Sequence, residues 1–445
     1  MSSKPSSKAP IIFLILFLGF TSADPHPEQV HLALTGNPGE MIISFMTMTN
    51  TSIQRIEYEI APCEWNDPLK TNYAIPNYPN PLDNGGGRIT YTYYVVLTEL
   101  LSYEEYCWRF VNQDQENSQA ENHILTPHDY SKLPLTVAMV GDLGVSGESM
   151  MSLLQGANSK SYDFVMHLGD IAYDLNTNQG HVGDTYMRDI DPIATRRPYM
   201  TCPGNHERDG NFTQYKARFN MPAPMYYTFR SSLTKFIVLH TDNWYDDNGF
   251  PIKSINDTSV GDLRLQLKWF ENELREAWKD RKHHPWVVVI GHHPLWCSDI
   301  LMDNTCSGKK DQTTILRNGT TTLPVGIEEM MYFFGVDIYM SAHVHAYERM
   351  YPLHQGIVLQ SNYTNPKSFV HLMAGKAGVL SDMDVFTNQH NGSAFQSYNT
   401  FQAEYGHLTI INGTHATYTQ YSTRDDSVVD QITIVVDHHG NRLDG

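Results

Sequence analysis

The stretches LTVAMVGD (residues 135–142) and DFVMHLGD (residues 163–170) decide the fold of this chain. Each is an apolar run of the length of a buried β-strand, and each ends in Gly-Asp. Further apolar runs of this length follow, and helical stretches lie among them. Strands that alternate with helices are typical of α/β domains. We therefore expect an α/β domain whose strands include residues 135–140, 163–168, 236–240, 286–290 and 336–340.

The clearest helix of this domain is predicted at residues 262–280, where apolar side chains recur at helical spacing. Asp262 is the expected N-cap. The segment 368–437 contains further strand patterns, and we expect it to complete a second sheet of the same domain. The buried stripe of the helix is expected to comprise Leu263, Leu267, Phe270, Leu274 and Trp278.

Residues 24–128 have a different pattern, in which short alternating apolar stretches are separated by turn-rich ones. Val30, Leu32 and Leu34 alternate with other residues, which indicates a strand with one buried face. About 100 residues of such strands are typical of an immunoglobulin-like sandwich. A linker at residues 127–134 follows. Two domains are also expected because 445 residues exceed the usual size of a single core.

Residues 1–23 are predicted to be a signal peptide. Lys4 and Lys8 precede an apolar run at 11–20, and small residues follow it. The run is too short to anchor the chain, so no stable membrane insertion is expected. Seven Asn-x-Ser/Thr tripeptides also indicate a secreted or lysosomal glycoprotein; their asparagines are Asn50, Asn211, Asn256, Asn318, Asn362, Asn391 and Asn412.

The five cysteines fit an oxidising compartment, with one thiol left over. Cys63 and Cys107 both lie in the first region and are candidates for one disulfide. Cys297 and Cys306 are close in sequence and are candidates for a second disulfide, which would close one loop. Cys202 would then remain free as a small buried residue rather than a nucleophile.

The net charge of the chain is strongly negative, since 31 basic residues face 49 acidic ones for a formal charge of -18. A nucleic-acid partner or a polybasic membrane contact is therefore not expected. An anionic substrate would have to be attracted by a local positive charge, and a bound metal ion is the obvious source.

Five short loops carry side chains of the types that bind metal ions, and most of these loops follow predicted strands. A single Asp after a strand is usually a turn or cap residue, so each loop alone is a weak signal. Loops at the carboxyl ends of strands in α/β domains converge in space. Together they predict a metal site made of GDLG (141–144), GDIAY (169–173), GNHE (204–207), VIGHH (289–293) and AHVH (342–345).

The donor types indicate two metal ions. A phenolate, carboxylates and one imidazole suit a hard trivalent ion such as Fe(III). Two imidazoles, an amide oxygen and a carboxylate suit a divalent ion such as Zn, Mn or Fe(II). One carboxylate must then be shared to hold the two ions about 3.5–4 Å apart.

The ordered set GDxG, GDxxY, GNHE, VxxH and xHxH resembles the purple acid phosphatases, in their larger form with an N-terminal fibronectin-like domain. The resemblance covers nearly all of the mature chain. It implies a β-sandwich over residues 24–128 and a calcineurin-like metallophosphoesterase domain over 133–437, with two packed mixed sheets flanked by helices and a family-specific segment at 368–437. It also implies that Fe(III) is bound by Asp142, Tyr173 and His345, that the divalent ion is bound by Asn205, His292 and His343, and that Asp170 bridges the two.

The resemblance implies an acid phosphatase, an enzyme that hydrolyses small-molecule phosphate monoesters and works best at acidic pH. Two cations would polarise the ester and activate a hydroxide that attacks phosphorus. His206, beside Asn205, is expected to stabilise the transition state or to protonate the leaving group. Plant members carry a further pair of histidines after VxxH, and residues 298–312 contain none. His293 is the candidate substitute.

Two other functions fit the sequence. The same site can hydrolyse phosphodiesters, pyrophosphate or phospholipid head groups, because the pocket walls rather than the metals select the ester. A secreted binding protein with a degenerate site is the other alternative, and the presence of all seven ligands argues against it. Ala342 replaces the usual Gly of GHxH, a change that a roomy turn tolerates. The sequence leaves open whether the protein forms a homodimer.

Overall fold

The computed structural model describes residues 26–439, apart from short gaps. The predicted signal peptide and the acceptor Asn256 lie outside the described residues. The gaps comprise residues 52, 66, 113–122, 247–248, 251, 253–257, 299, 301–304, 307–310, 321–323, 379 and 398–400.

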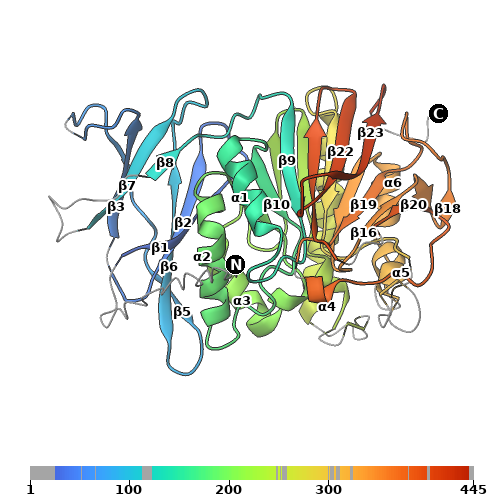
Figure 1. Ribbon diagram of the computed structural model, residues 1–445, viewed down its shortest axis with the longest axis horizontal. Coiled ribbons are helices and arrows are strands. Elements are labelled where there is room, and N and C mark those ends of the chain that lie inside the picture. Colours follow the sequence, from blue (N-terminus) through green and yellow to red (C-terminus); the bar gives the residue numbers. More distant parts are fainter. Residues whose placement is uncertain are drawn as a thin grey trace, which may run out of the picture.

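The N-terminal region is the expected β-sandwich, made of two antiparallel four-stranded sheets (Figure 1). One sheet has the order β1-β2-β6-β5 and the other β4-β3-β7-β8. Trp108 is fully buried between them. The strands are β1 (Glu28–Ala33), β2 (Met41–Thr47), β3 (Ile53–Ile60), β4 (Asn72–Ala74), β5 (Asn80–Asp83), β6 (Ile89–Leu97), β7 (Tyr106–Asn112) and β8 (His123–Leu125).

Strand β1 differs from the prediction of one buried face. All its residues after Glu28 are buried, including Gln29 and His31. The reason is that β1 belongs to the sandwich on one side and contacts helix α2 (His181–Ala194) of the following domain on the other. Alternation in the sequence of β1 predicted the face that packs inside the sandwich. The other face is covered by a helix of the second domain, which the alternation does not indicate.

The second domain contains two packed mixed sheets, as the resemblance implies. The first has the order β11-β10-β9-β21-β22-β23 and the second β12-β13-β14-β15-β19-β16-β20. Apolar side chains from both sheets share one core. The strands are β9 (Leu135–Val140), β10 (Phe164–His167), β11 (Tyr199–Thr201), β12 (Tyr227–Ser231), β13 (Thr234–Val238), β14 (Trp286–Ile290), β15 (Ile338–Ser341), β16 (Tyr347–Met350), β19 (Val370–Ala374), β20 (Ser393–Gln396), β21 (Glu404–Ile410), β22 (His415–Ser422) and β23 (Val428–Val435), with a small hairpin of β17 (Leu353–His354) and β18 (Ile357–Val358).

The C-terminal segment does not complete one sheet, as predicted, but joins both. Strand β19 runs parallel to β15 inside the second sheet. Strand β21 pairs antiparallel with β9 and so extends the first sheet by three strands. The β9–β21 pair joins residues about 270 positions apart, for example Thr136 with Thr409, and alternation within a strand does not identify such a distant partner.

The long helix α4 (Thr258–Lys279) starts earlier than predicted, so Asp262 lies inside it and is not its N-cap. Leu263, Leu267, Phe270 and Leu274 are buried as expected. Trp278 is 48% exposed, and Ala277, three residues after Leu274, is buried instead. The other helices are α1 (Met150–Ser159), α3 (Asp209–Arg218), α5 (Gln312–Asn318) and α6 (Glu328–Phe333), with 3₁₀ turns η1 (Asn205–Glu207), η2 (Thr241–Trp244) and η3 (Leu380–Asp382).

Buried polar contacts join the two domains. Arg218 on α3 donates from Nη1 to Asp184 Oδ1 on α2 at 2.9 Å and to Gln29 Oε1 of the sandwich at 3.0 Å. Arg88 of the sandwich also pairs with Asp184. The Arg218 and Asp184 side chains are 0% and 1% exposed. The domains are therefore held by an ion-pair network whose central pair, Arg218 and Asp184, is buried.

The covalent features agree with export. Both candidate disulfides are present, with Cα–Cα distances of 6.0 Å for Cys63–Cys107 and 5.3 Å for Cys297–Cys306. Cys202 is a buried free thiol. The six sequon asparagines within the described residues are all exposed, so the chain is accessible to glycosylation there, and modification itself stays a prediction. In the part of the chain that the structure describes, no helix has the length and apolar character needed to cross a bilayer.

Candidate metal centre

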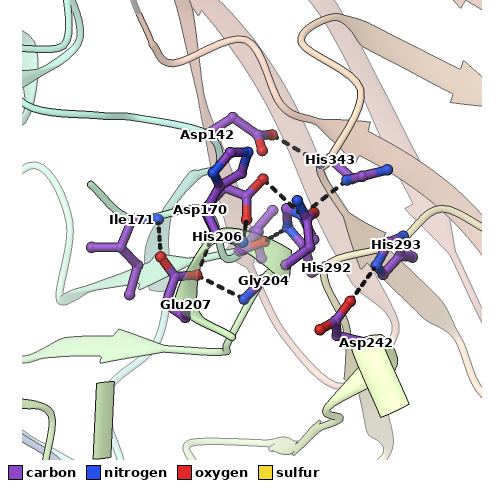
Figure 2. A network of polar contacts seen from close by, with 12 residues as sticks. Asp142, Asp170, Ile171, Gly204, His206, Glu207, Asp242, His292, His293 and His343 are labelled. Atoms are coloured by element: carbon purple, nitrogen blue, oxygen red, sulfur yellow. Dashed lines mark hydrogen bonds and ion pairs between the residues drawn. The ribbon is translucent and has the colours of Figure 1, made fainter. Parts of the chain in front are cut away.

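The side chains from the five predicted loops meet at the carboxyl ends of the central strands (Figure 2). Strands β9, β10 and β11 run parallel in one sheet, and β14 and β15 run parallel in the other. The loop after each strand therefore emerges at the same edge of its sheet. These loops carry, in order, Asp142, then Asp170 and Tyr173, then Asn205, then His292, and finally His343 and His345.

Four of these residues form one compact donor set. One donor atom from each of Asp170, His292 and His343 lies within 4.8 Å of the others. His292 Nε2 is 3.2 Å from Asp170 Oδ2 and 3.1 Å from the amide oxygen of Asn205. His343 Nδ1 is 3.1 Å from His292 Nε2. Two imidazoles, an amide oxygen and a carboxylate thus point at a common centre, which is the donor set expected for a divalent ion.

Hydrogen bonds at the outer ring nitrogens select the tautomers of the two histidines. His292 Nδ1 lies 2.8 Å from the carbonyl oxygen of Leu168, which accepts its proton. His343 Nε2 lies 2.9 Å from Gln312 Oε1, which also acts as an acceptor. The inner nitrogens, Nε2 of His292 and Nδ1 of His343, are therefore the ones available to a metal ion. Metal-binding histidines are oriented in this way by an acceptor on the other nitrogen.

A second donor set adjoins the first. The Tyr173 hydroxyl is 2.7 Å from His345 Nε2, and His345 Nε2 is 3.9 Å from Asp142 Oδ1. Asp142 Oδ1 is buried and, among the described residues, has no hydrogen-bond donor. Burial raises the pKa of Asp142 to about 7. A buried carboxylate oxygen without a donor is stabilised by a cation, so this set also fits a metal ion.

The electrostatics around Asp170 favour positive charge. Burial opposes the charge on His292, but the Asp170 carboxylate outweighs it and raises the pKa of His292 to about 10. Burial likewise opposes the charge on Asp170, and His292 nevertheless holds its pKa well below the usual range. A metal cation satisfies the same field, because it binds a neutral imidazole and an ionised carboxylate together.

The backbone is strained at the donor residues. Asp142, Asp170, Tyr173 and His343 have φ values of 56°, 49°, 54° and 71°. This left-handed conformation is uncommon for residues other than glycine and costs energy. Strain of this kind concentrates at functional sites, where the surrounding fold holds it in place.

Two glycines permit the close approach of the loops. A Cβ at Gly204 would lie 2.5 Å from the backbone nitrogen of Asp170 and would also collide with its carboxylate. A Cβ at Gly141 would collide with the side chain of Ala342, which is fully buried. Ala342 is therefore accommodated in place of the usual glycine because the residue that faces it has no side chain.

Glu207, to which sequence reasoning assigned no role, ties the second and third loops together. Its carboxylate accepts hydrogen bonds from the backbone nitrogens of Gly204, Asp170 and Ile171 at 2.8, 3.0 and 2.9 Å. It is 2% exposed. Burial raises its pKa, and the Asp170 carboxylate adds to this effect. The only signal in the sequence was the acidic residue at the end of GNHE.

The two histidines expected to act in catalysis lie in different environments. The His206 side chain is 36% exposed and its Nδ1 lies 3.1 Å from Asp174 Oδ1. His206 also packs on the Tyr173 ring at a centroid distance of 4.7 Å. His293 is buried, and its Nε2 points at Asp242 Oδ1 at 3.4 Å (Figure 2). The same ring lies 4.2 Å from that of His343.

Comparison with known proteins gives three consecutive family matches. The models are the purple acid phosphatase N-terminal domain at residues 27–126, calcineurin-like phosphoesterase at 135–347, and iron/zinc purple acid phosphatase-like protein C at 368–431. Acid phosphatase type 7 of Danio rerio is 32% identical, with 93% of this chain and 92% of the relative covered. The Homo sapiens protein of the same name is 31% identical, with 96% and 94% covered.

The fold has a counterpart among solved structures. A purple acid phosphatase from yellow lupin (Lupinus luteus) seeds superposes with a TM-score of 0.73 over 93% of this chain and 75% of that one, at 19% identity. The three family segments cover both domains in the order found here. The chain therefore belongs to the purple acid phosphatase family, in its two-domain form.

Proposed function

We propose that this protein is an acid phosphatase that hydrolyses phosphate monoesters at a binuclear centre. The observation that carries the proposal is that two different donor sets adjoin each other, since His343 N of one donates to Asp142 Oδ2 of the other at 2.9 Å. We assign Asp142, Tyr173 and His345 to Fe(III), and Asn205, His292 and His343 to a divalent ion (Zn, Mn or Fe(II)), with Asp170 shared. When bound, the two cations would stabilise the negative charge on the phosphate oxygens and lower the pKa of the water molecule that attacks phosphorus.

The chain itself orients the ligand histidines and supplies a histidine that can carry a proton. Gln312 and the Leu168 carbonyl hold the ligand histidines in the tautomers described above. His206 is half-exposed beside the centre, and its backbone nitrogen donates to Asp170 Oδ1 at 3.0 Å. We assign it contact with the phosphate or protonation of the leaving group. His293 is directed at Asp242 and packs on His343, so we assign it to positioning that ligand.

The experiment that tests this proposal is a visible absorption spectrum of the purified protein before and after mild reduction. A ferric ion on the Tyr173 phenolate is expected to give a broad visible band that shifts on reduction. Tyr173→Phe is expected to lose the band while the protein stays folded. A colourless protein that is active with its full metal content would contradict the Fe(III) assignment and leave Tyr173 without a role.

Substitution His206→Gln is expected to lower kcat/KM for a phosphate monoester by about 10²-fold, the usual contribution of a positioned acid–base group. The metal content should stay that of the wild type, because His206 is not among the assigned ligands. A matched control is His283→Gln, since His283 is also exposed and also lies 3.0 Å from an aspartate, Asp280. Full activity in the His206 variant would remove this residue from the mechanism.

A further inference from the structure

A cleft of about 770 Å³ lies between the sandwich and the second domain. It is lined by residues of β1, β8, α1 and α2 and by the turn that leads into β11, elements that lie side by side in Figure 1. This volume is in the range of small-molecule sites. The cleft is separate from the metal centre, because Arg197 in its wall precedes β11 whereas Asn205 follows that strand.

Arg197 is the unusual residue of this cleft. It is 9% exposed, and its Nε is buried without a hydrogen-bond partner. Within the described part of the chain its guanidinium makes no hydrogen bond and no ion pair. Asp163 attracts the guanidinium through space, but its carboxylate already pairs with Lys132 Nζ at 2.5 Å and accepts from Thr136 N at 2.9 Å.

Other buried arginines of the molecule show how such a group is normally satisfied. Arg218, in the same domain interface, bonds to Asp184 and Gln29. Arg349 is 9% exposed, as Arg197 is, and it forms a two-point contact with Asp430 at 2.7 and 2.9 Å. A buried guanidinium that lacks such partners is unfavourable. Arg197, which lines the cleft, therefore has donor capacity that the described part of the protein does not use.

The acidic groups of the cleft wall do not compensate Arg197. Glu28 Oε1 pairs with Arg188 at 2.7 Å, and Asp191 Oδ2 accepts from Val30 N at 2.9 Å. Lys160 and Arg196, both exposed, add two further positive charges to the lining, and Glu105, also exposed, adds a negative one. The buried part of the wall is thus positive, and apolar side chains such as Ile124 and Pro192 lie beside it.

We propose that this cleft binds a small organic anion, whose carboxylate or phosphate group is held by Arg197 and whose apolar body lies against the wall of the sandwich. The planar guanidinium matches either group with two parallel hydrogen bonds. Because the lining contains both charged and apolar side chains, a ligand with an anionic group and an apolar body fits it better than a small inorganic anion. This site would be a second ligand site of the protein and does not depend on the assignment of the metal ligands.

The test compares benzoate, phenylphosphonate and neutral benzamide as ligands of the full mature protein, by thermal unfolding over a concentration series. Ligands that bind the folded state raise the unfolding temperature. We expect benzoate or phenylphosphonate to do so and benzamide not to, and the better of the two anions identifies the head group. Phenylphosphonate also resembles a phosphate ester, so only the part of its effect that Arg197→Met removes is assigned to the cleft.

Arg197→Met is expected to weaken binding of the preferred anion by at least about tenfold, the value of one charged hydrogen-bond pair. In anion-free buffer the variant should unfold at the same temperature as the wild type or above it, because an unpaired buried charge has been removed. The matched control is Arg230→Met, since Arg230 is exposed and does not line the cleft, and it should bind normally.

Two results would overturn the proposal. One is a wild type that neither anion stabilises, and the other is an Arg197→Met variant that keeps the anion effect. If Arg197→Met does not fold, Arg197→Lys serves as the test, because an ammonium keeps the charge but cannot make the two parallel bonds. Its affinity for the anion should fall, and unchanged affinity would count against the site.

Discussion

Substitution Asp170→Ala is expected to abolish phosphatase activity, with a loss in kcat/KM of at least about 10³-fold. Asp170 is the one carboxylate assigned to both donor sets, and its removal should leave the protein unable to hold two ions. The charge stabilisation that metal ions supply is several kcal/mol, and each 1.4 kcal/mol corresponds to about tenfold in rate. The measurements are steady-state kinetics with a phosphate monoester and metal content per chain by elemental analysis.

Two controls separate loss of metal from loss of fold. Asp170→Asn keeps the shape of the side chain and its two oxygen or nitrogen positions, and it should also lose activity because the shared charge is gone. Asp83→Ala removes an exposed carboxylate of the sandwich and should behave as the wild type. An Asp170→Ala protein with normal kinetics and two ions per chain would refute the bridging assignment, whatever the outcome at Arg197.

Substitution Arg218→Ala is expected to destabilise the protein by about 3 kcal/mol or more. The change leaves Asp184, which is 1% exposed, with a buried charge that only Arg88 and neighbouring donors compensate. Breaking a buried ion pair on one side costs about 3–5 kcal/mol. The loss should appear in urea or thermal unfolding, together with faster proteolytic cleavage in the interdomain linker at residues 127–134.

The exposed pair Arg230–Asp280 provides a reference for this prediction. Arg230 is 44% exposed and lies 3.3 Å from Asp280, so Arg230→Ala should cost less than about 1 kcal/mol. A double variant, Arg218→Met with Asp184→Leu, should recover part of the stability, because neither charge is then left buried. Equal effects of Arg218→Ala and Arg230→Ala would show that the buried network does not hold the domains together.

The strands and the loops of the metal centre follow from the sequence because their signals are local. Buried parallel strands are short continuous apolar runs, and the Gly-Asp and His-rich loops directly follow them. Helix α4 shows the limit of this reasoning. Its apolar stripe predicted the body of the helix, but the first turn lies before the stripe and starts at Thr258, so periodicity placed the start too late.

The order of strands within each sheet was decided by the tertiary structure. Strand β21 pairs with β9, and β1 is buried on both faces because α2 covers the second one. These contacts join residues more than 100 positions apart. Alternation within a strand indicates one apolar face, and it contains no information about which element covers that face or whether another element covers the second one.

The sequence by itself determined the sandwich and the α/β architecture and predicted the donor residues of the candidate metal centre, since each depends on residue type and on spacing over a few positions. Only the tertiary structure decided what surrounds them. It showed that Glu207 binds the backbone of two loops, that Gln312 accepts a hydrogen bond from His343 and that His293 faces Asp242. It also showed that Arg197 Nε is buried without a hydrogen-bond partner among the described residues. The physical reason is that hydrogen-bond partners and burial are properties of side chains brought together from distant segments, and no single segment contains them.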